Sequence, residues 1–248
     1  MNIVGIIPAR YASKRLPGKA LLDIGGKSMV QRVYEQSLGA PSLSRVLVAT
    51  DDQRILDHVH SFGGEAIMTS IHHQSGTDRC YEAIEGLNSN YDVVINIQGD
   101  EPFIHPNEIE ELCQLMVNHQ SDIGTLAKVF TDKKKLLDPN FGKVVINRQG
   151  YAMYFSRSII PHNGELDKIE DISQLNYLKH IGIYAFKREV LKELVAMKQS
   201  YLELNEKLEQ LRWLENGYQI RVGLTSYDSN GVDTEEDLEN ARKIINSQ

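Results

Sequence analysis

The segment IVGIIPARYASKRLPGK, residues 3–19, joins a short apolar run directly to a loop that is rich in positive charge. The run from Ile3 to Ile7 ends at Pro8, as expected for a strand that is buried on both faces of a parallel sheet. A loop that follows such a strand lies at the C-terminal edge of the sheet, where open α/β sheets bind their ligands. Residues 3–19 therefore predict a buried strand followed by a binding loop.

A strand followed by a helix recurs through the first half of the chain. Ser28 precedes apolar residues spaced as on one face of a capped amphipathic helix. Further strands are predicted at Val46–Ala49, Ala66–Met68 and Val93–Ile97, and further helices at Ile55–Phe62, Asp78–Leu87 and Ile109–Met116. Repeated βα units imply an α/β fold with a parallel sheet and right-handed crossovers.

After about residue 123 the predicted strands lie closer together, which indicates a mixed-sheet extension. These strands are Ile123–Val129, Lys143–Asn147, Tyr151–Phe155 and Ile181–Phe186, and helices are predicted at Leu202–Leu214 and from Thr234 to about Ile245. No Pro/Gly/Ser-rich linker separates the two parts. We therefore expect one domain over residues 1–248, with a first half of about 1–122 and a second half of about 123–248.

Composition and charge exclude several classes of protein. The net charge of -7 argues against a nucleic-acid binder, which normally carries a broad basic surface. The apolar run at the N-terminus is too short for a signal peptide or a membrane span. The 2 cysteines, Cys80 and Cys113, have no metal-ligand spacing and do not suggest a disulfide framework. We expect a cytoplasmic protein that does not bind membranes.

Four cations, Arg10, Lys14, Arg15 and Lys19, lie close together in the loop after the first strand. A polyanion such as a triphosphate would account for them on an acidic protein, although a solvated basic loop has the same composition. No GxGxxG motif follows the strand, which argues against a dinucleotide. A Walker A loop ending at Ser28 would need glycine where Leu21 stands, so Gly25-Gly26-Lys27 is interpreted as a tight turn.

Two aspartates are candidates for a magnesium site. Asp100 follows the buried strand Val93–Ile97, where a carboxylate can bind Mg²⁺ that bridges nucleotide phosphates, or can simply cap a turn. Asp233 could be a second ligand or the N-cap of the last helix, a role for which Thr234 competes. Only pairing with Asp100 would make Asp233 a metal ligand.

A set of longer motifs extends almost from end to end of the chain. They are IIPARYASKRLPGKALLDIGGKSM (6–29), VATDD (48–52), HHQSGTDR (72–79), INIQGDEPFI (95–104), YFSRSIIP (154–161), KHIGIYAF (179–186), LEQLRWLENG (208–217) and GVDTEEDL (231–238). In this order they resemble the 3-deoxy-manno-octulosonate (Kdo) cytidylyltransferases. The first motif alone is similar to the wider family of sugar nucleotidyltransferases.

The resemblance implies a Rossmann-like, GT-A-type nucleotidyltransferase fold, a three-layer α/β sandwich, and a homodimer formed through the second half. It implies that CTP is bound by Arg10, Ser13, Arg15, Lys19, Ser75, Gly76 and Gln98. By the same resemblance, Asp100 and Asp233 hold Mg²⁺ and act in catalysis together with Lys19. The sugar acid would be surrounded by Arg157, His180, Tyr184, Glu209 and Gln210.

The expected reaction is transfer of CMP from CTP to Kdo, with release of pyrophosphate, for lipopolysaccharide biosynthesis. The chemistry of the sugar-site residues agrees with this expectation, because Arg157 can pair bidentately with a carboxylate. The alternatives are the same reaction on 8-amino-Kdo or another keto-sugar acid, a metal-dependent glycosyltransferase, and a non-catalytic nucleotide sensor. A glycosyltransferase would use a sugar nucleotide, whereas the cationic loop suits an intact triphosphate better.

Overall fold

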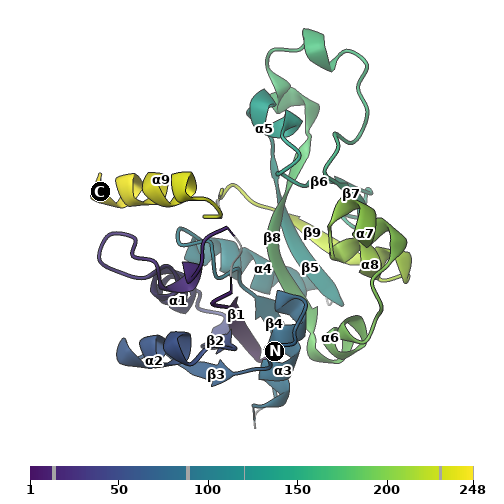
Figure 1. Ribbon diagram of the computed structural model, residues 1–248. Helices are drawn as coiled ribbons and strands as arrows, with labels where there is room; N and C mark the ends of the chain where they lie inside the picture. Colours follow the sequence, from purple (N-terminus) through teal and green to yellow (C-terminus); the bar gives the residue numbers. More distant parts are fainter. Residues whose placement is uncertain (13–14, 88–89, 120, 229–230, 248) are drawn as a thin grey trace. The chain divides into compact units, whose positions relative to one another are not determined.

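The computed structural model describes residues 1–12, 15–87, 90–119, 121–228 and 231–247 (Figure 1). The chain forms two compact units. The first contains Met1–Cys113 together with Asp228–Gln248, and the second contains Gln114–Tyr227. The segment that carries Asp233 therefore belongs to the unit formed by the N-terminal residues.

The first unit contains four parallel strands, β1 (Ile3–Ala9), β2 (Leu43–Thr50), β3 (Ala66–Met68) and β4 (Val93–Asn96). Their order is β3-β2-β1-β4. Strands β2 and β3 are added on one side of β1, and β4 is added on the other side. The boundary between β1 and β4 is therefore a topological switch point. Ligands of open α/β sheets bind outside the C-terminal ends of the strands at such a point.

Helices α1 (Met29–Leu38), α2 (Gln53–Ser61) and α3 (Gly76–Glu85) pack against these strands (Figure 1). Each begins after a residue whose side-chain oxygen accepts a backbone N–H: Ser28, Asp52 and Ser75 respectively. Such caps satisfy N–H groups that the first helical turn leaves without a partner. Gly25 and Gly26, at φ 63° and 83°, form the tight turn predicted before α1.

The second unit is built on β5 (Ile123–Val129), β8 (Leu178–Lys187) and β9 (Ile220–Leu224). β5 pairs antiparallel with β8 and parallel with β9, a strand that the sequence pattern did not predict. Strands β6 (Lys143–Ile146) and β7 (Ala152–Ser156) pair with each other, and β6 also pairs with β8. This unit also contains η2 (Leu166–Lys168), η3 (Ile172–Leu175), α5 (Lys133–Leu137) and α6 (Arg188–Val195). The chain passes from the first unit to the second within α4 (Pro106–His119).

The prediction of a single helix over Leu202–Leu214 is wrong. The segment forms two short helices, α7 (Tyr201–Glu206) and α8 (Gln210–Glu215), separated by Lys207 in the left-handed region at φ 55°. The buried ion pair of Glu203 and Arg212, 2.7 Å between Oε1 and Nη2, explains the break. Nine residues of continuous helix would place these side chains about 13 Å apart along the axis.

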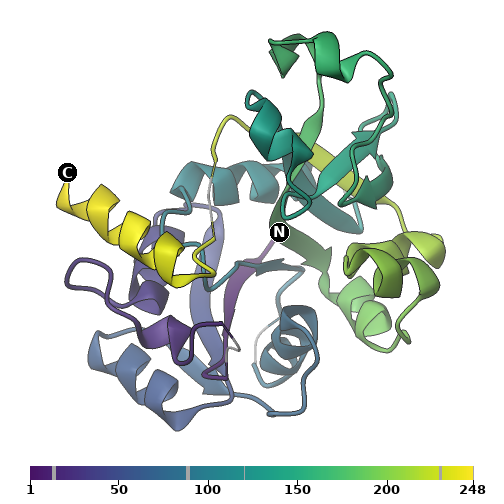
Figure 2. The same ribbon diagram turned by 45° about the horizontal axis from the view of Figure 1, so that its top comes forward.

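The C-terminal helix α9 (Glu235–Asn246) packs beside the segment that follows β1 (Figure 2). Thr234 is its N-cap and forms a capping box with Asp237, so the competition between Asp233 and Thr234 is resolved in favour of Thr234. A cluster of buried apolar side chains joins the two segments: Leu16, Ile24, Met29, Val232, Leu238 and Ala241. This core holds residue 233 next to the loop after β1.

Cys80 and Cys113 are buried, and neither forms a disulfide. Within the described ranges, no helix combines the length and the apolar character needed to cross a membrane.

Candidate active site

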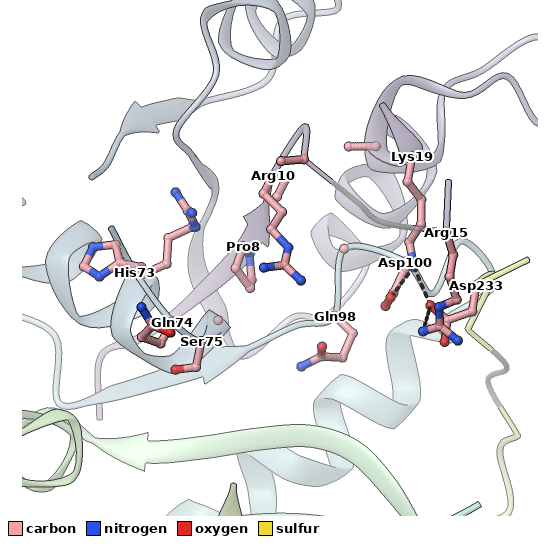
Figure 3. Close-up of a pocket in the computed structure, with 16 residues that line it drawn as sticks. Pro8, Arg10, Arg15, Lys19, His73, Gln74, Ser75, Gln98, Asp100 and Asp233 are labelled. Carbon is pink, nitrogen blue, oxygen red and sulfur yellow. Dashed lines mark hydrogen bonds and ion pairs between the residues drawn. The ribbon is translucent and has the colours of Figure 1, made fainter. Parts of the chain in front are cut away.

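A pocket of about 640 Å³ lies in the first unit at the C-terminal ends of β1 and β4, where the strand order reverses (Figure 3). Several of the predicted nucleotide and metal residues line it together: Arg10, Arg15, Lys19, Ser75, Gly76, Gln98, Asp100 and Asp233. Ser13 and Lys14 lie outside the described residues. The pocket thus collects side chains from four separate segments of the sequence.

Lys19 is the centre of an ion cluster in this pocket. Its Nζ lies 2.7 Å from Oδ2 of Asp100 and 2.9 Å from Oδ1 of Asp233 (Figure 3). Nη2 of Arg15 approaches the same Asp233 oxygen to 3.0 Å. The Lys19 side chain is only 14% exposed, whereas Arg15 is 63% exposed. Lys19 therefore lies inside the pocket between both carboxylates, whereas Arg15 extends toward solvent.

The two aspartates have the donor set and the convergence that a magnesium ion needs. Both carboxylates reach one cation, the Lys19 ammonium, and Mg²⁺ is typically held by one or two carboxylates together with phosphate oxygens. The backbone also joins the pair, because the N–H of Val232 donates to the carbonyl of Asp100 at 2.9 Å. Across the part of the chain that is described, no cluster of three or more acidic, His or Cys side chains offers a closed metal site.

Two glycines allow the walls of the pocket to approach each other. A Cβ on Gly99 would lie 2.7 Å from the carbonyl oxygen of Pro8, a distance too short for any other residue. A Cβ on Gly76 would lie 3.1 Å from Cγ of Pro8. The loop after β4 and the N-terminus of α3 can therefore both lie against the end of β1. A helix N-terminus at this place favours an anion, because its first N–H groups point outward.

Arg79, the last residue of the HHQSGTDR motif, also lines the pocket, a role that the sequence did not predict. It is 4% exposed, and its guanidinium donates to Oδ2 of Asp51 at 2.7 Å and to Oγ1 of Thr69 at 2.6 Å. These contacts tie α3 to the loops that follow β2 and β3. The signal available in the sequence was that HHQSGTDR ends in a cation four residues after the helix cap, on the same helical face.

His73 and Gln74 line the pocket as well, and they too were missed. The His73 ring hydrogen bonds to the carboxylate of Glu82, which also accepts the N–H of Ser70 at 2.8 Å. Glu82 therefore anchors the whole turn ahead of Ser75.

In the second unit, His180 and Tyr184 lie in contact on β8, with ring centroids 5.4 Å apart. Burial, and then the charge of Lys179, lowers the pKa of His180 to about 3, so the ring is neutral at physiological pH. Burial, and then the charge of Glu209, raises the pKa of Tyr184, so the phenol keeps its proton. The hydroxyl of Tyr184 is buried without a hydrogen-bond partner among the described residues.

Gln210 and Glu209 stand at the start of α8. The Nε2 of Gln210 is, like the Tyr184 hydroxyl, buried without a partner in the described structure. Buried polar atoms are normally paired, so a water or a ligand would satisfy both of these atoms. Glu209 forms an ion pair with Arg212, 3.5 Å between Oε1 and Nη2.

Arg157 is held by three backbone carbonyls, two of which lie at the turn between α7 and α8. Its guanidinium donates to the carbonyl oxygens of Glu206 at 2.8 Å, Pro139 at 3.0 Å and Lys207 at 3.4 Å. The carboxylate of Glu206 accepts the backbone N–H of Arg157 at 2.9 Å. This side chain therefore has a structural role in the loop, whatever ligand it also binds.

Comparison with known proteins identifies the family. A family model described as cytidylyltransferase matches residues 4–220. The 3-deoxy-manno-octulosonate cytidylyltransferase of Parabacteroides distasonis is 52% identical, with 99% of this chain and 98% of that protein covered. The enzyme of the same name from Thermodesulfovibrio yellowstonii is 50% identical, with 100% and 99% covered.

A solved structure of CMP:2-keto-3-deoxy-manno-octonic acid synthetase complexed with CTP matches this chain with a TM-score of 0.92 at 42% identity, covering 100% of this chain and 99% of that one. A cytidylyltransferase structure from Leptospira borgpetersenii has a TM-score of 0.65 at 18% identity, covers 100% of this chain and 88% of that one, and shares the fold alone. The predicted Rossmann-like nucleotidyltransferase fold is confirmed.

Proposed function

This chain belongs to the cytidylyltransferase family, and we propose that it transfers CMP from CTP to 3-deoxy-manno-octulosonate. The anomeric hydroxyl of the sugar acid attacks the α-phosphorus of CTP, a new O–P bond forms, and the bond to the leaving pyrophosphate breaks. Two observations support this function. The chain matches the structure of CMP:2-keto-3-deoxy-manno-octonic acid synthetase complexed with CTP with a TM-score of 0.92, and it has a cationic pocket at the topological switch point of the sheet.

Arg10, Arg15 and Lys19 bind the triphosphate in this proposal. They line the same pocket, and positioning and charge neutralisation dominate phosphoryl-type transfer. Ser75, Gly76 and Gln98 lie next to the nucleotide, and the N-terminus of α3 adds backbone N–H donors. Ser13 is assigned to the phosphates by the family resemblance.

Asp100 and Asp233 hold Mg²⁺ in this proposal. Support comes from their convergence on one cation, 2.7 and 2.9 Å from Lys19 Nζ. When bound, Mg²⁺ neutralises charge on the phosphates and on the leaving pyrophosphate. Lys19 is shared by both aspartates, so it orients the carboxylates and adds positive charge beside the triphosphate.

The second unit supplies the groups for the sugar acid: Arg157, His180, Tyr184, Glu209 and Gln210. Neutral His180 and protonated Tyr184 bind hydroxyl groups, which need donors and acceptors rather than charge. The unpartnered atoms of Tyr184 and Gln210 support this assignment. A homodimer in the cytoplasm completes the proposal, and two buried cysteines that form no disulfide agree with a reducing compartment.

The function is tested by pyrophosphate release from each of the four nucleoside triphosphates, with Mg²⁺ and a panel containing Kdo, 8-amino-Kdo and other keto-sugar acids. We expect turnover with CTP and Kdo to exceed every other combination. Equal turnover with ATP would contradict the nucleotide assignment. A preference for 8-amino-Kdo would change the assigned sugar acid but not the class of reaction. CTP binding without turnover would indicate a nucleotide sensor.

Arg157→Lys is expected to raise the KM for the sugar acid about tenfold or more and to leave the KM for CTP nearly unchanged. Lysine cannot reproduce a bidentate contact with a carboxylate, a loss of roughly 1.5–3 kcal/mol. Steady-state kinetics for both substrates measure the split. The exposed Arg148 of the same unit supplies a matched control, Arg148→Lys.

Because Arg157 also binds three carbonyls, the melting temperature is measured in parallel. A lower melting temperature with an unchanged sugar KM would make Arg157 structural only. A selective defect toward CTP would place Arg157 with the triphosphate cations instead.

A further inference from the structure

An irregularity in the pairing of β5 with β8 brings His180 and Tyr184 together. Thr125 pairs with Tyr184, and the next residue on β5, Leu126, pairs with Ile181, so two residues of β8 bulge between adjacent pairs. Side chains four residues apart on a regular strand lie about 13 Å from each other. The ring centroids here are 5.4 Å apart, so the bulge creates the pair.

Thr125 stands opposite this bulge and binds it from the other strand. Its side chain is fully buried. The Oγ1 atom lies 2.8 Å from the carbonyl oxygen of Ile183, 3.1 Å from that of Ile181 and 3.1 Å from Nε2 of His180. One hydroxyl therefore contacts the backbone of the bulge and the imidazole ring at once.

Counting protons assigns the tautomer of His180. A hydroxyl has one proton to donate, and the two carbonyl oxygens can only accept it. If that proton goes to a carbonyl, the Thr125 oxygen can only accept from Nε2, which must then carry hydrogen. The reverse arrangement would direct the lone pairs of the hydroxyl at two carbonyl oxygens. The contacts therefore select the Nε2–H tautomer, and the neutral ring keeps an acceptor lone pair on Nδ1.

The Nδ1 side of the ring faces Gly142. A Cβ added to Gly142 would lie 3.8 Å from Nδ1, at van der Waals contact, and glycine leaves that position empty. The backbone N–H of His180 donates to the carbonyl of Gly142 at 2.9 Å, which holds the two segments in register. Nδ1 is thus the acceptor of the ring, and residue 142 places no side chain against it.

We propose that Thr125 is a positioning residue for the sugar acid: it stabilises the bulge that joins His180 to Tyr184, and it holds His180 as the Nε2–H tautomer, so that Nδ1 accepts a hydrogen bond from a substrate hydroxyl. This inference rests on the proposed function, in which His180 lies at the sugar acid. Serine would keep the hydroxyl in place, whereas valine has the same shape and removes it.

The first test is made on the unmodified protein. Two-bond ¹H–¹⁵N correlation spectra of the ¹⁵N-histidine-labelled chain report which ring nitrogen carries hydrogen, and His180→Gln identifies the His180 signals. We expect the Nε2–H tautomer at pH 7. The Nδ1–H tautomer, or an even mixture, would overturn the proposal without any variant of Thr125.

The second test compares Thr125→Val with Thr125→Ser. We expect valine to abolish the tautomer preference and to raise the KM for the sugar acid about tenfold, the size of effect typical of one lost buried hydrogen bond, with an unchanged KM for CTP. Thr125→Ser is expected to keep the tautomer preference and the KM for the sugar acid close to those of the unmodified protein. Thr225→Val is the matched control, because the hydroxyl of that buried threonine accepts the local backbone N–H of Tyr227, 3.2 Å away in the same unit.

An unchanged tautomer in a folded Thr125→Val protein would overturn the proposal. A changed tautomer with an unchanged sugar KM would overturn the positioning role as well, and would remove His180 from the sugar site. Failure of the proposed function is distinguished by the unmodified chain, which would then release no pyrophosphate from CTP and Kdo although its His180 tautomer can still be read.

Discussion

Asp100→Asn is expected to lower kcat by about a hundred- to a thousandfold, the range observed when a group that stabilises transition-state charge is removed. Asparagine keeps the shape of the side chain, and its amide oxygen can still accept from Lys19, now 2.7 Å from the carboxylate. The carbonyl of Asp100 still accepts the N–H of Val232, so the loop stays in place. The change therefore removes the charge and keeps the fold. Pyrophosphate release and the melting temperature measure the two effects separately.

Asp122→Asn is the matched control for this variant. Asp122 forms an ion pair with Lys187, 2.8 Å between Oδ1 and Nζ, and its side chain is 54% exposed, so its loss has little effect on stability or turnover. Excess EDTA is expected to bring the unmodified enzyme to the low turnover of Asp100→Asn. Full activity in EDTA, or turnover of Asp100→Asn equal to that of Asp122→Asn, would contradict the assignment of Asp100 to magnesium.

Asp233→Asn is expected to lower kcat about a hundredfold and to leave the melting temperature almost unchanged. Its carboxylate receives Lys19 at 2.9 Å and Arg15 at 3.0 Å, and it does not cap α9, because Thr234 has that role. The variant therefore removes one of two converging charges from the pocket without disturbing the helix. Turnover is measured across a range of Mg²⁺ concentrations, and a higher requirement for the ion is expected.

Thr234→Ala, at the neighbouring residue, is expected to lower the melting temperature and to leave kcat almost unchanged. Losing the N-cap destabilises α9 by about 1 kcal/mol and lowers the melting temperature, while turnover at low temperature stays near that of the unmodified enzyme. If Asp233→Asn kept full turnover at limiting Mg²⁺, residue 233 would have no part in binding the ion.

The elements of the first unit were predictable because their signals are local. Ile3–Ile7 is an uninterrupted apolar run ended by proline, and β1 extends it by two residues. The position of Ser28 before an apolar stripe predicts a helix cap, and α1 begins at Met29. Each of these signals comes from residues within one turn or one strand, so the chain carries them before any tertiary contact forms.

The errors arose where a contact distant in sequence overrides a local preference. Leu202–Leu214 has helical periodicity throughout, yet Arg212 folds back onto Glu203 and the helix breaks at Lys207. β9 was missed because its five residues are recognisable only as a partner of β5, a strand nearly a hundred residues earlier. Strand pairing depends on the neighbour as much as on intrinsic propensity.

Some residues of the candidate active site were likewise predictable from local sequence, and others were not. Residues 8–19 and 98–101 each follow an apolar strand, and that pattern alone indicated a cationic loop and an acidic loop at the C-terminal edge of a sheet. The local sequence leaves two roles open for Asp233, because it suits a helix cap as well as a metal ligand. Its carboxylate meets Lys19 across 214 residues of chain because α9 packs its apolar face on Leu16, Ile24 and Met29. Convergence of charges from distant segments depends on how buried apolar surfaces fit together, and no local pattern of residues encodes that fit.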